Sequence, residues 1–125
     1  MIVISKEQIL KMHDSLIAEF GGMRGIRNIH LLESAINNAF QTFEGNDLYP
    51  TIFDKAANLC FSLINNHAFI DGNKRIGVLV MLVFLELNGY KVNFSNKRLI
   101  DIGLKTASGE LNQNMIKQWL IDNCE

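Results

Sequence analysis

Proline, paired cysteines and an excess of charge are what this chain of 125 residues has least of. Its single proline leaves long stretches of backbone able to form helices. The two cysteines, Cys60 and Cys124, make no Cys-x-x-Cys pair and belong to no cluster of metal ligands. A disulfide framework and a zinc site are therefore excluded, and we expect a reducing, cytoplasmic setting.

Neither sign of charge dominates the chain. Twelve lysines and arginines stand against thirteen aspartates and glutamates, which gives a net charge of −1 at pH 7. Proteins that bind nucleic acid through phosphate contacts need a broad positive face. We therefore expect no direct binding to nucleic acid.

Long hydrophobic runs are also absent. The longest run, residues 76–85, holds ten residues before Glu86 interrupts it, whereas a helix needs about 20 to cross a bilayer. The first residues of the chain lack the charged and apolar regions of a secretory signal. We expect no membrane association, and we interpret residues 76–85 as part of a buried core helix.

The apolar residues that are present make up 48% of the chain and recur at helical spacing. Together with capping residues and glycines they predict six helices, at about 6–20, 28–40, 52–66, 73–88, 96–106 and from 113 onward. Strand signal is limited to the neighbours of Val3, residues 42–50 and residues 92–94. The predicted fold class is all-α, a bundle of about six helices with a small β flap, in one domain covering residues 1–125.

Residues 42–50 are polar, contain adjacent Gly45 and Asn46, and are expected to form that exposed flap. Its side chains Glu44, Asp47 and Tyr49 either guide a protein substrate or belong to a solvated hairpin. The sequence leaves both interpretations open.

One stretch, residues 67–75, combines a base, a carboxylate and two cations in nine positions. His67 has an ordinary pKa near neutrality and can take a proton from a hydroxyl. Asp71 is a hard oxygen ligand of the kind that holds Mg²⁺ against a triphosphate. Phe69, between them, is expected to anchor the loop in the core.

The second half of this stretch has the residues of a phosphate site. Gly72 allows close backbone approach, and Asn73, Lys74 and Arg75 stand where the central helix begins. Unpaired N–H groups and the positive end of the helix dipole attract phosphate there. Arg75 adds a bidentate grip and Lys74 a point charge.

A plainer interpretation remains beside this one: a helix-capping loop whose Asp and Asn side chains only satisfy backbone donors. The triplet Asn-Lys-Arg of residues 73–75 recurs at residues 96–98. No His or Asp precedes it there as in the motif, and a solvated helix end is expected. His13 shares a helical face with Ile9 and Ile17, which favours a core histidine with one hydrogen-bond partner over a metal ligand.

A glycine-rich loop, residues 21–27, follows the first predicted helix. Its glycines are expected to serve left-handed backbone between two helices rather than to cradle a ligand. Arg24 and Arg27 remain secondary candidates for phosphate contact.

The nine residues 67–75 resemble the signature of the Fic/Doc family, His-x-Phe-x-Asp-(Gly or Ala)-Asn-(Lys or Gly)-Arg. Lysine at position 74 is similar to the Doc (death-on-curing) toxin branch. The resemblance extends over the whole chain, through blocks at residues 21–27, 31–35 and 47–50. Ala68 stands where many Fic proteins carry proline, and this position varies among Doc relatives.

The resemblance implies a Fic fold and a toxin that moves the terminal phosphate of ATP to a protein hydroxyl, a threonine of elongation factor Tu in the Doc branch. It implies His67 as the base, Asp71 as the Mg²⁺ ligand or the group that orients the base, and residues 72–75 as the nucleotide and phosphate site. The family's inhibitory segment, Ser/Thr-x-x-x-Glu-Gly/Asn, is absent from this chain. Control is therefore expected from elsewhere, and the resemblance implies a small antitoxin whose C-terminal segment folds onto this domain.

Two other functions stay open at this point. The same loop could transfer AMP, rather than phosphate, to a protein hydroxyl. A chain that kept the helical core but lost catalysis would instead be a non-catalytic binding module.

Overall fold

The computed structural model describes all of residues 1–125 and contains six helices and one antiparallel hairpin. The elements are α1 Lys6–Phe20, α2 Ile29–Ala39, β1 Thr42–Phe43, β2 Asn46–Asp47, α3 Ile52–Asn66, α4 Asn73–Leu87, α5 Asn96–Ser108 and α6 Gln113–Asn123. The predicted all-α bundle with a small β flap is confirmed.

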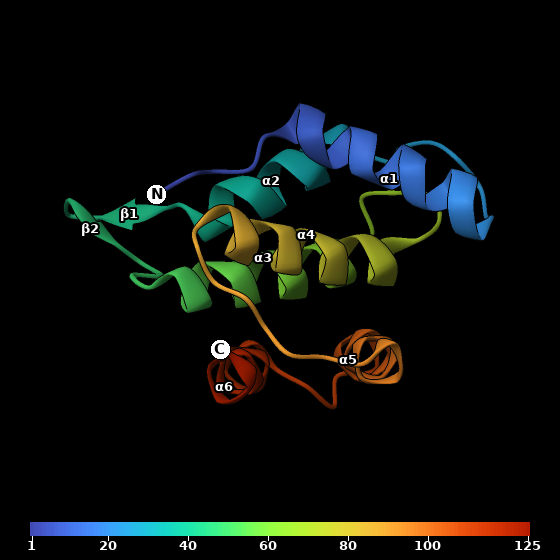
Figure 1. The fold of residues 1–125 in the computed structure, drawn as a ribbon. Helices are drawn as coiled ribbons and strands as arrows, with labels where there is room; N and C mark the ends of the chain where they lie inside the picture. The colour runs from blue at the N-terminus through green and yellow to red at the C-terminus, as the bar shows by residue number, and fades with distance from the viewer.

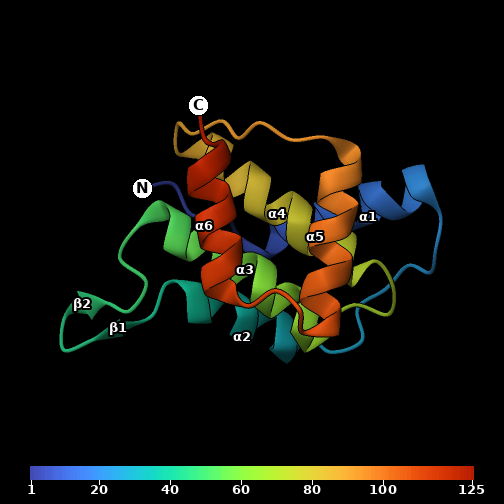
Figure 2. The ribbon, with the colours of Figure 1, turned by 90° about the horizontal axis from the view of Figure 1, so that it is seen from below.

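The helices lie in three layers of two (Figure 1). Helices α3 and α4 run side by side in the middle, α1 and α2 cover one face, and α5 and α6 cover the other, as the view from below also shows (Figure 2). Helix α3 touches α2, α4, α5 and α6, and residues 55–60 within it are all buried. The hydrophobic core of 23 buried residues is therefore centred on α3 and α4.

A glycine sets the close packing of the two central helices. A Cβ at Gly77 of α4 would lie 2.7 Å from Cγ1 of Ile64 and 3.1 Å from the carbonyl oxygen of Cys60, both in α3. Any larger residue would push α3 and α4 apart, because a contact under 3.0 Å forces a neighbour to move. This packing fixes the segment that joins α3 to α4.

The predicted helix ends agree with the observed ones to within about two residues, which is the usual uncertainty of helix boundaries. The Ser5–Gln8 and Thr51–Asp54 capping boxes are both formed. Each caps a helix through the hydroxyl of its first residue and the side chain three positions on. The termini were predictable because these signals are local.

The strand predictions are right for the flap and wrong elsewhere. Residues around Val3 form no strand, and Val92 contributes only an isolated bridge to Cys124. The flap is tied down by Lys55, whose buried ammonium donates to the Asp47 carboxylate at 3.1 Å and to the Tyr49 carbonyl. Because the flap precedes α3 and residues 67–72 follow it, the 15-residue helix separates them by about 22 Å (Figures 1 and 2). The flap and the motif loop thus lie at opposite ends of α3.

None of the six helices combines the length and the apolarity that crossing a bilayer requires.

Candidate active site

The site is built on residues 67–72, the motif loop, which joins the end of α3 to the start of α4. It is the yellow-green segment at one end of the bundle, under the end of α1 (Figure 1). His67 ends α3 in a left-handed conformation, with φ 52° and ψ 48°, and its side chain is exposed. Asp71, Lys74 and Arg75 are exposed as well, whereas Phe69 is 2% exposed. The loop therefore presents the four groups predicted for chemistry and buries the one predicted as an anchor.

The anchor is held on one side by α1. His13 is 1% exposed, its ring stacks on that of Phe69 with centroids 3.9 Å apart, and its Nε2–H donates to the Asp71 carbonyl at 2.7 Å. Since a carbonyl only accepts, this bond fixes the proton of His13 on Nε2. His13 is the core histidine with one hydrogen-bond partner that the sequence predicted.

Asn73 holds the anchor from the other side. The N–H of Phe69 donates to Asn73 Oδ1 at 3.1 Å, and Asn73 Nδ2 donates to the carbonyl of Phe69 at 3.0 Å. The amide thus replaces the backbone partners that Phe69 lacks in the loop. The sequence assigned this side chain to phosphate, but here it stabilises the loop.

The Asp71 carboxylate fastens the motif loop to residues 21–28, the loop between α1 and α2. Its oxygens accept the backbone N–H of Met23 at 3.1 Å and that of Gly72 at 2.9 Å. These two N–H groups lower the pKa of Asp71 from its ordinary value, and the charge of Arg75 acts in the same direction. The carboxylate is therefore ionised and exposed, with lone pairs left for a cation.

The start of α4 differs from that of every other helix. Helices α1, α2, α3, α5 and α6 each begin with a Ser, Thr or Asn side chain that accepts a backbone N–H of the first turn. The residue that precedes helix α4 is Gly72, which has φ 77° and no side chain that could cap the helix. Its first-turn N–H groups at residues 73–75 have no partner and remain available to an anion.

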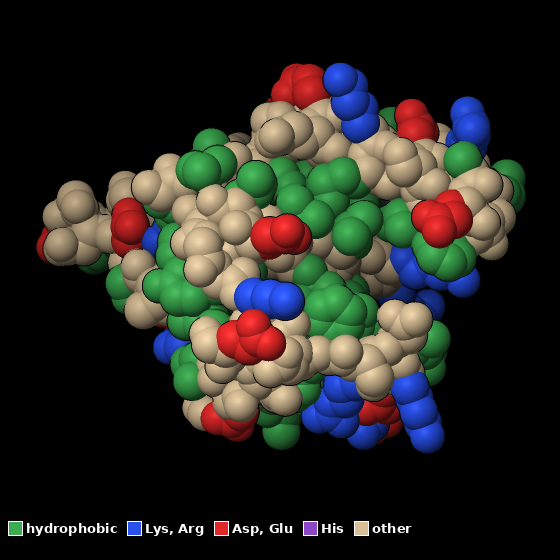
Figure 3. Space-filling model, in the orientation of Figure 1, with side chains coloured by type: hydrophobic (Ala, Val, Ile, Leu, Met, Phe, Trp, Pro, Cys, Tyr) green, Lys and Arg blue, Asp and Glu red, His purple; other side chains and the backbone are tan.

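The cations predicted beside this helix start are in place. Arg75 is exposed and lies over the ring of Phe20, 5.0 Å from its centroid. Lys74 packs its stem against Gly103 of α5, where an added Cβ would lie 3.4 Å from Lys74 Cβ. Blue side chains gather on this side of the molecule in the space-filling view (Figure 3). The N-terminal start of α4 is therefore electropositive, through both its backbone N–H groups and the neighbouring side chains.

Residues 21–28 run antiparallel to the motif loop. Ile26 and Phe69 form a bridge, the N–H of Ile70 donates to the Gly25 carbonyl at 3.2 Å, and the N–H of Arg27 donates to the Ala68 carbonyl at 2.8 Å. The Arg27 guanidinium, a secondary candidate for phosphate, instead donates to main-chain carbonyls at the end of α3. Arg24 is exposed and makes no hydrogen bond.

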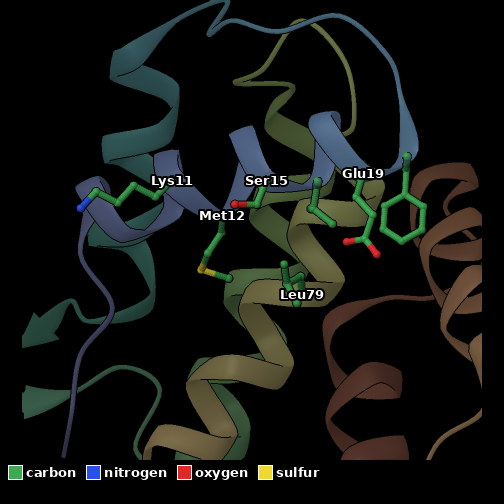
Figure 4. Close-up of a pocket in the computed structure, with 7 residues that line it drawn as sticks. Lys11, Met12, Ser15, Glu19 and Leu79 are labelled. Atoms are coloured by element: carbon green, nitrogen blue, oxygen red, sulfur yellow. The ribbon is translucent and has the colours of Figure 1, made fainter.

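A shallow groove of about 400 Å³ lies beside the site, between α1 and α4 (Figure 4). Its lining includes Met12, Ser15, Glu19 and Leu79, and Phe20 is shared with the Arg75 contact. Lys11 is its one cation, and Glu19 offsets that charge. The charge of the groove therefore does not suit a triphosphate. The uncapped N-terminal start of α4 suits one better.

Three contributions to the site escaped sequence reasoning. Gly22 lies so close to the motif loop that an added Cβ would be 2.6 Å from Asp71 Oδ2. The sequence also did not predict that His13 stacks on Phe69, or that Arg27 donates a hydrogen bond to the carbonyl of His67. The only sequence signal was the density of glycine and arginine in residues 21–27, which does not tell what these residues contact.

Comparison with known proteins gives a consistent assignment. A model of the Fic/DOC family matches residues 3–85, which include the α1–α2 loop, the flap and the complete motif loop. The chain is 36% identical over 99 residues to the protein named Toxin Doc of Mycolicibacterium smegmatis, covering 78% of this chain and 76% of that protein. It is 28% identical over 117 residues to Protein kinase doc of Escherichia phage P1, covering 94% and 91%. The chain therefore belongs to the Fic/Doc family, on its Doc branch.

Proposed function

We propose that this protein is a Doc-type toxin that transfers the terminal phosphate of ATP to a hydroxyl of a protein target. The observation that carries the proposal is the exposed His67 on the same loop as the uncapped, electropositive start of α4. The names of the two relatives, a toxin and a protein kinase, support the reaction class.

His67 is the proposed catalytic base. Its side chain is exposed and makes no hydrogen bond within the protein, so a substrate hydroxyl can reach it from solvent. The imidazole accepts the proton as the hydroxyl oxygen attacks phosphorus, and the P–O bond to the leaving ADP breaks. The backbone N–H groups at the start of α4 and the Lys74 and Arg75 side chains bind the phosphate oxygens and offset their charge.

Asp71 is the proposed Mg²⁺ ligand. The fit is good because the carboxylate is ionised, exposed and directed by two backbone N–H groups. No group of three His, Cys, Asp or Glu side chains is placed to hold a metal ion without help. A single carboxylate suits Mg²⁺, which takes its remaining ligands from phosphates and water and, when bound, neutralises phosphate charge.

The proposal is tested by incubating the purified protein and a bacterial extract with ATP labelled in either the terminal or the innermost phosphate. Terminal label on a protein is the expected result, and innermost label would show AMP transfer instead. No label on any protein would identify a non-catalytic binding module. Mass spectrometry of the labelled band then identifies the target, for which elongation factor Tu is the first candidate, modified at a threonine.

Two variants test the assigned roles in the same assay. His67→Ala is expected to lower turnover by about 10²- to 10⁴-fold, the usual contribution of a positioned base. Arg75→Lys is expected to lower ATP affinity, because a point charge cannot replace the planar fork. The matched control is Arg98→Lys, in the other Asn-Lys-Arg triplet, where the Ser95 hydroxyl caps the helix. Equal effects of the two arginine changes would contradict a phosphate role for Arg75.

We further propose that a small antitoxin controls this activity, through a C-terminal segment that folds onto the domain. Expression of this chain alone should then arrest growth, and co-expression of the antitoxin should restore it. Harmless accumulation of the folded protein would count against the toxin assignment.

A further inference from the structure

The guanidinium of Arg27 makes a contact that the proposed mechanism does not use. Its Nε donates to the carbonyl of His67 at 2.7 Å, and its Nη2 donates to the carbonyl of Asn66 at 3.3 Å. Arg27 precedes α2, so this contact bridges 40 positions of sequence to reach the last residues of α3. A cation at a helix C-terminus satisfies unpaired carbonyls and complements the dipole.

The end of α3 needs such a partner. At the C-terminal ends of the other five helices, the backbone N–H of the cap residue donates to a carbonyl of the last turn. At α3 the cap residue is His67, and its N–H makes no such bond. The Arg27 guanidinium instead donates to the carbonyls of the last helical residue, Asn66, and of His67 itself.

His67 itself is in a conformation that requires support. It is one of only two residues other than glycine with positive φ, and the second, Glu44, sits in the turn of the flap. A side chain with a Cβ disfavours left-handed backbone, and such a residue persists only where its surroundings hold it. The φ and ψ of His67 decide where its Cα–Cβ bond points, and hence where the imidazole can go.

Arg27 holds both peptide groups that follow the Cα of His67. Its side chain binds the carbonyl of His67, and its own backbone N–H binds the carbonyl of Ala68 at 2.8 Å. The N–H of Asn28 binds that second carbonyl too, at 3.1 Å. The orientation of the chain on leaving His67 is therefore set by one arginine and its neighbour.

We propose that Arg27 is a positioning residue that holds His67 in its left-handed conformation and so directs its imidazole toward the substrate. The catalytic part of this inference rests on the proposed function; the conformational part does not. This scheme assigns Arg27 no phosphate contact, and the two guanidinium hydrogen bonds that the structure shows go to the carbonyls of His67 and Asn66.

The kinetic test compares Arg27→Met with Arg24→Met, a matched change in the same loop at an arginine without hydrogen bonds. Arg27→Met is expected to lower kcat by about 10- to 100-fold, the effect of a misplaced reacting group, while KM for ATP changes by less than about threefold. In a His67→Ala background the same change should lower kcat no further, because Arg27 acts only through His67. A raised KM with unchanged kcat, or an undiminished further loss in that background, would overturn the inference.

A second test needs no activity. The fall in Tm that Arg27→Met causes is measured in His67→Gly and in His67→Ala proteins. In the His67→Ala protein, loss of Arg27 lets residue 67 leave the strained conformation and recover part of its cost, whereas glycine adopts positive φ without strain. The fall should therefore be larger in the His67→Gly protein if Arg27 holds that conformation. Equal falls would refute it. If the wild-type protein transfers nothing from ATP, the proposed function fails, while this comparison still decides whether Arg27 holds His67.

Discussion

Replacing Asn73 with alanine tests how the motif loop is held. The change removes both hydrogen bonds between the amide and the backbone of Phe69. Each bond contributes about 1 kcal/mol net, and a buried backbone group left without a partner costs about 1–3 kcal/mol. Alanine is the better helix former by about 0.5 kcal/mol, which offsets little of this loss. We therefore expect the free energy of unfolding to fall by about 2–4 kcal/mol.

The measurement is thermal unfolding followed by circular dichroism, together with urea unfolding. For a chain of 125 residues, each kcal/mol shifts Tm by about 3–5 °C, so Asn73→Ala should lower Tm by about 10 °C. Asn65→Ala is the matched control: Asn65 also bonds a carbonyl four residues before it, that of Phe61, but on the exposed face of α3. It should change stability by less than about 0.5 kcal/mol.

The activity of the same variants separates two roles for Asn73. If its amide only holds Phe69, Asn73→Ala should lower kcat through a loosened loop and leave KM for ATP nearly unchanged. A large rise in KM for ATP would instead support the direct contact between Asn73 and phosphate that the sequence suggested. A Tm within about 2 °C of the wild type, a shift expected from well under 1 kcal/mol, would refute the anchoring role outright.

Three further predictions concern the same region and the core. Gly22→Ala should displace the Asp71 carboxylate and lower both Tm and Mg²⁺-dependent turnover, whereas Gly21→Ala, with similar positive φ but no atom within 4 Å of the added Cβ, should lower Tm alone. Because backbone N–H groups lower the pKa of Asp71, its stabilisation is present above the ordinary pKa of 3.8 and is lost as the pH falls through the lower folded value. The stability difference between wild type and Asp71→Asn, from urea unfolding, should therefore narrow from about pH 6 to about pH 3. Burial raises the pKa of the Cys60 thiol to about 12, so a thiol reagent should label Cys124 in the folded protein and Cys60 only after unfolding.

Sequence reasoning succeeded where the controlling interactions are local. The capping boxes at Ser5 and Thr51, the glycine after α4 and the apolar spacing of each helix all act within a few residues. These signals predicted six helices, the flap and the buried place of Phe69. The strand expected near Val3 failed because alternation over a few apolar residues does not supply a partner strand.

The parts that sequence could not predict depend on contacts between distant segments. The bond from His13 to Asp71 joins residues 58 positions apart, and that from Met23 to Asp71 joins residues 48 apart. Nothing near Arg27 in the chain indicates that its guanidinium donates hydrogen bonds to carbonyls at the C-terminal end of α3. Motif residues could be named from their chemistry, while the residues that orient them emerged only once the fold was known.

The structure bears on the two interpretations of the motif loop, because Asp71 and Asn73 do satisfy backbone donors but do not cap α4. A loop that existed only to begin a helix would use its Asp or Asn side chain to cap that helix, as Asn112 does for α6. Here Asp71 bonds to Met23 and Gly72, and Asn73 bonds back to Phe69. Both side chains are directed away from the first-turn N–H groups of α4, which remain free beside two exposed cations. Leaving donors unpaired is unfavourable for a helix end, and this supports the proposal that an anion binds there.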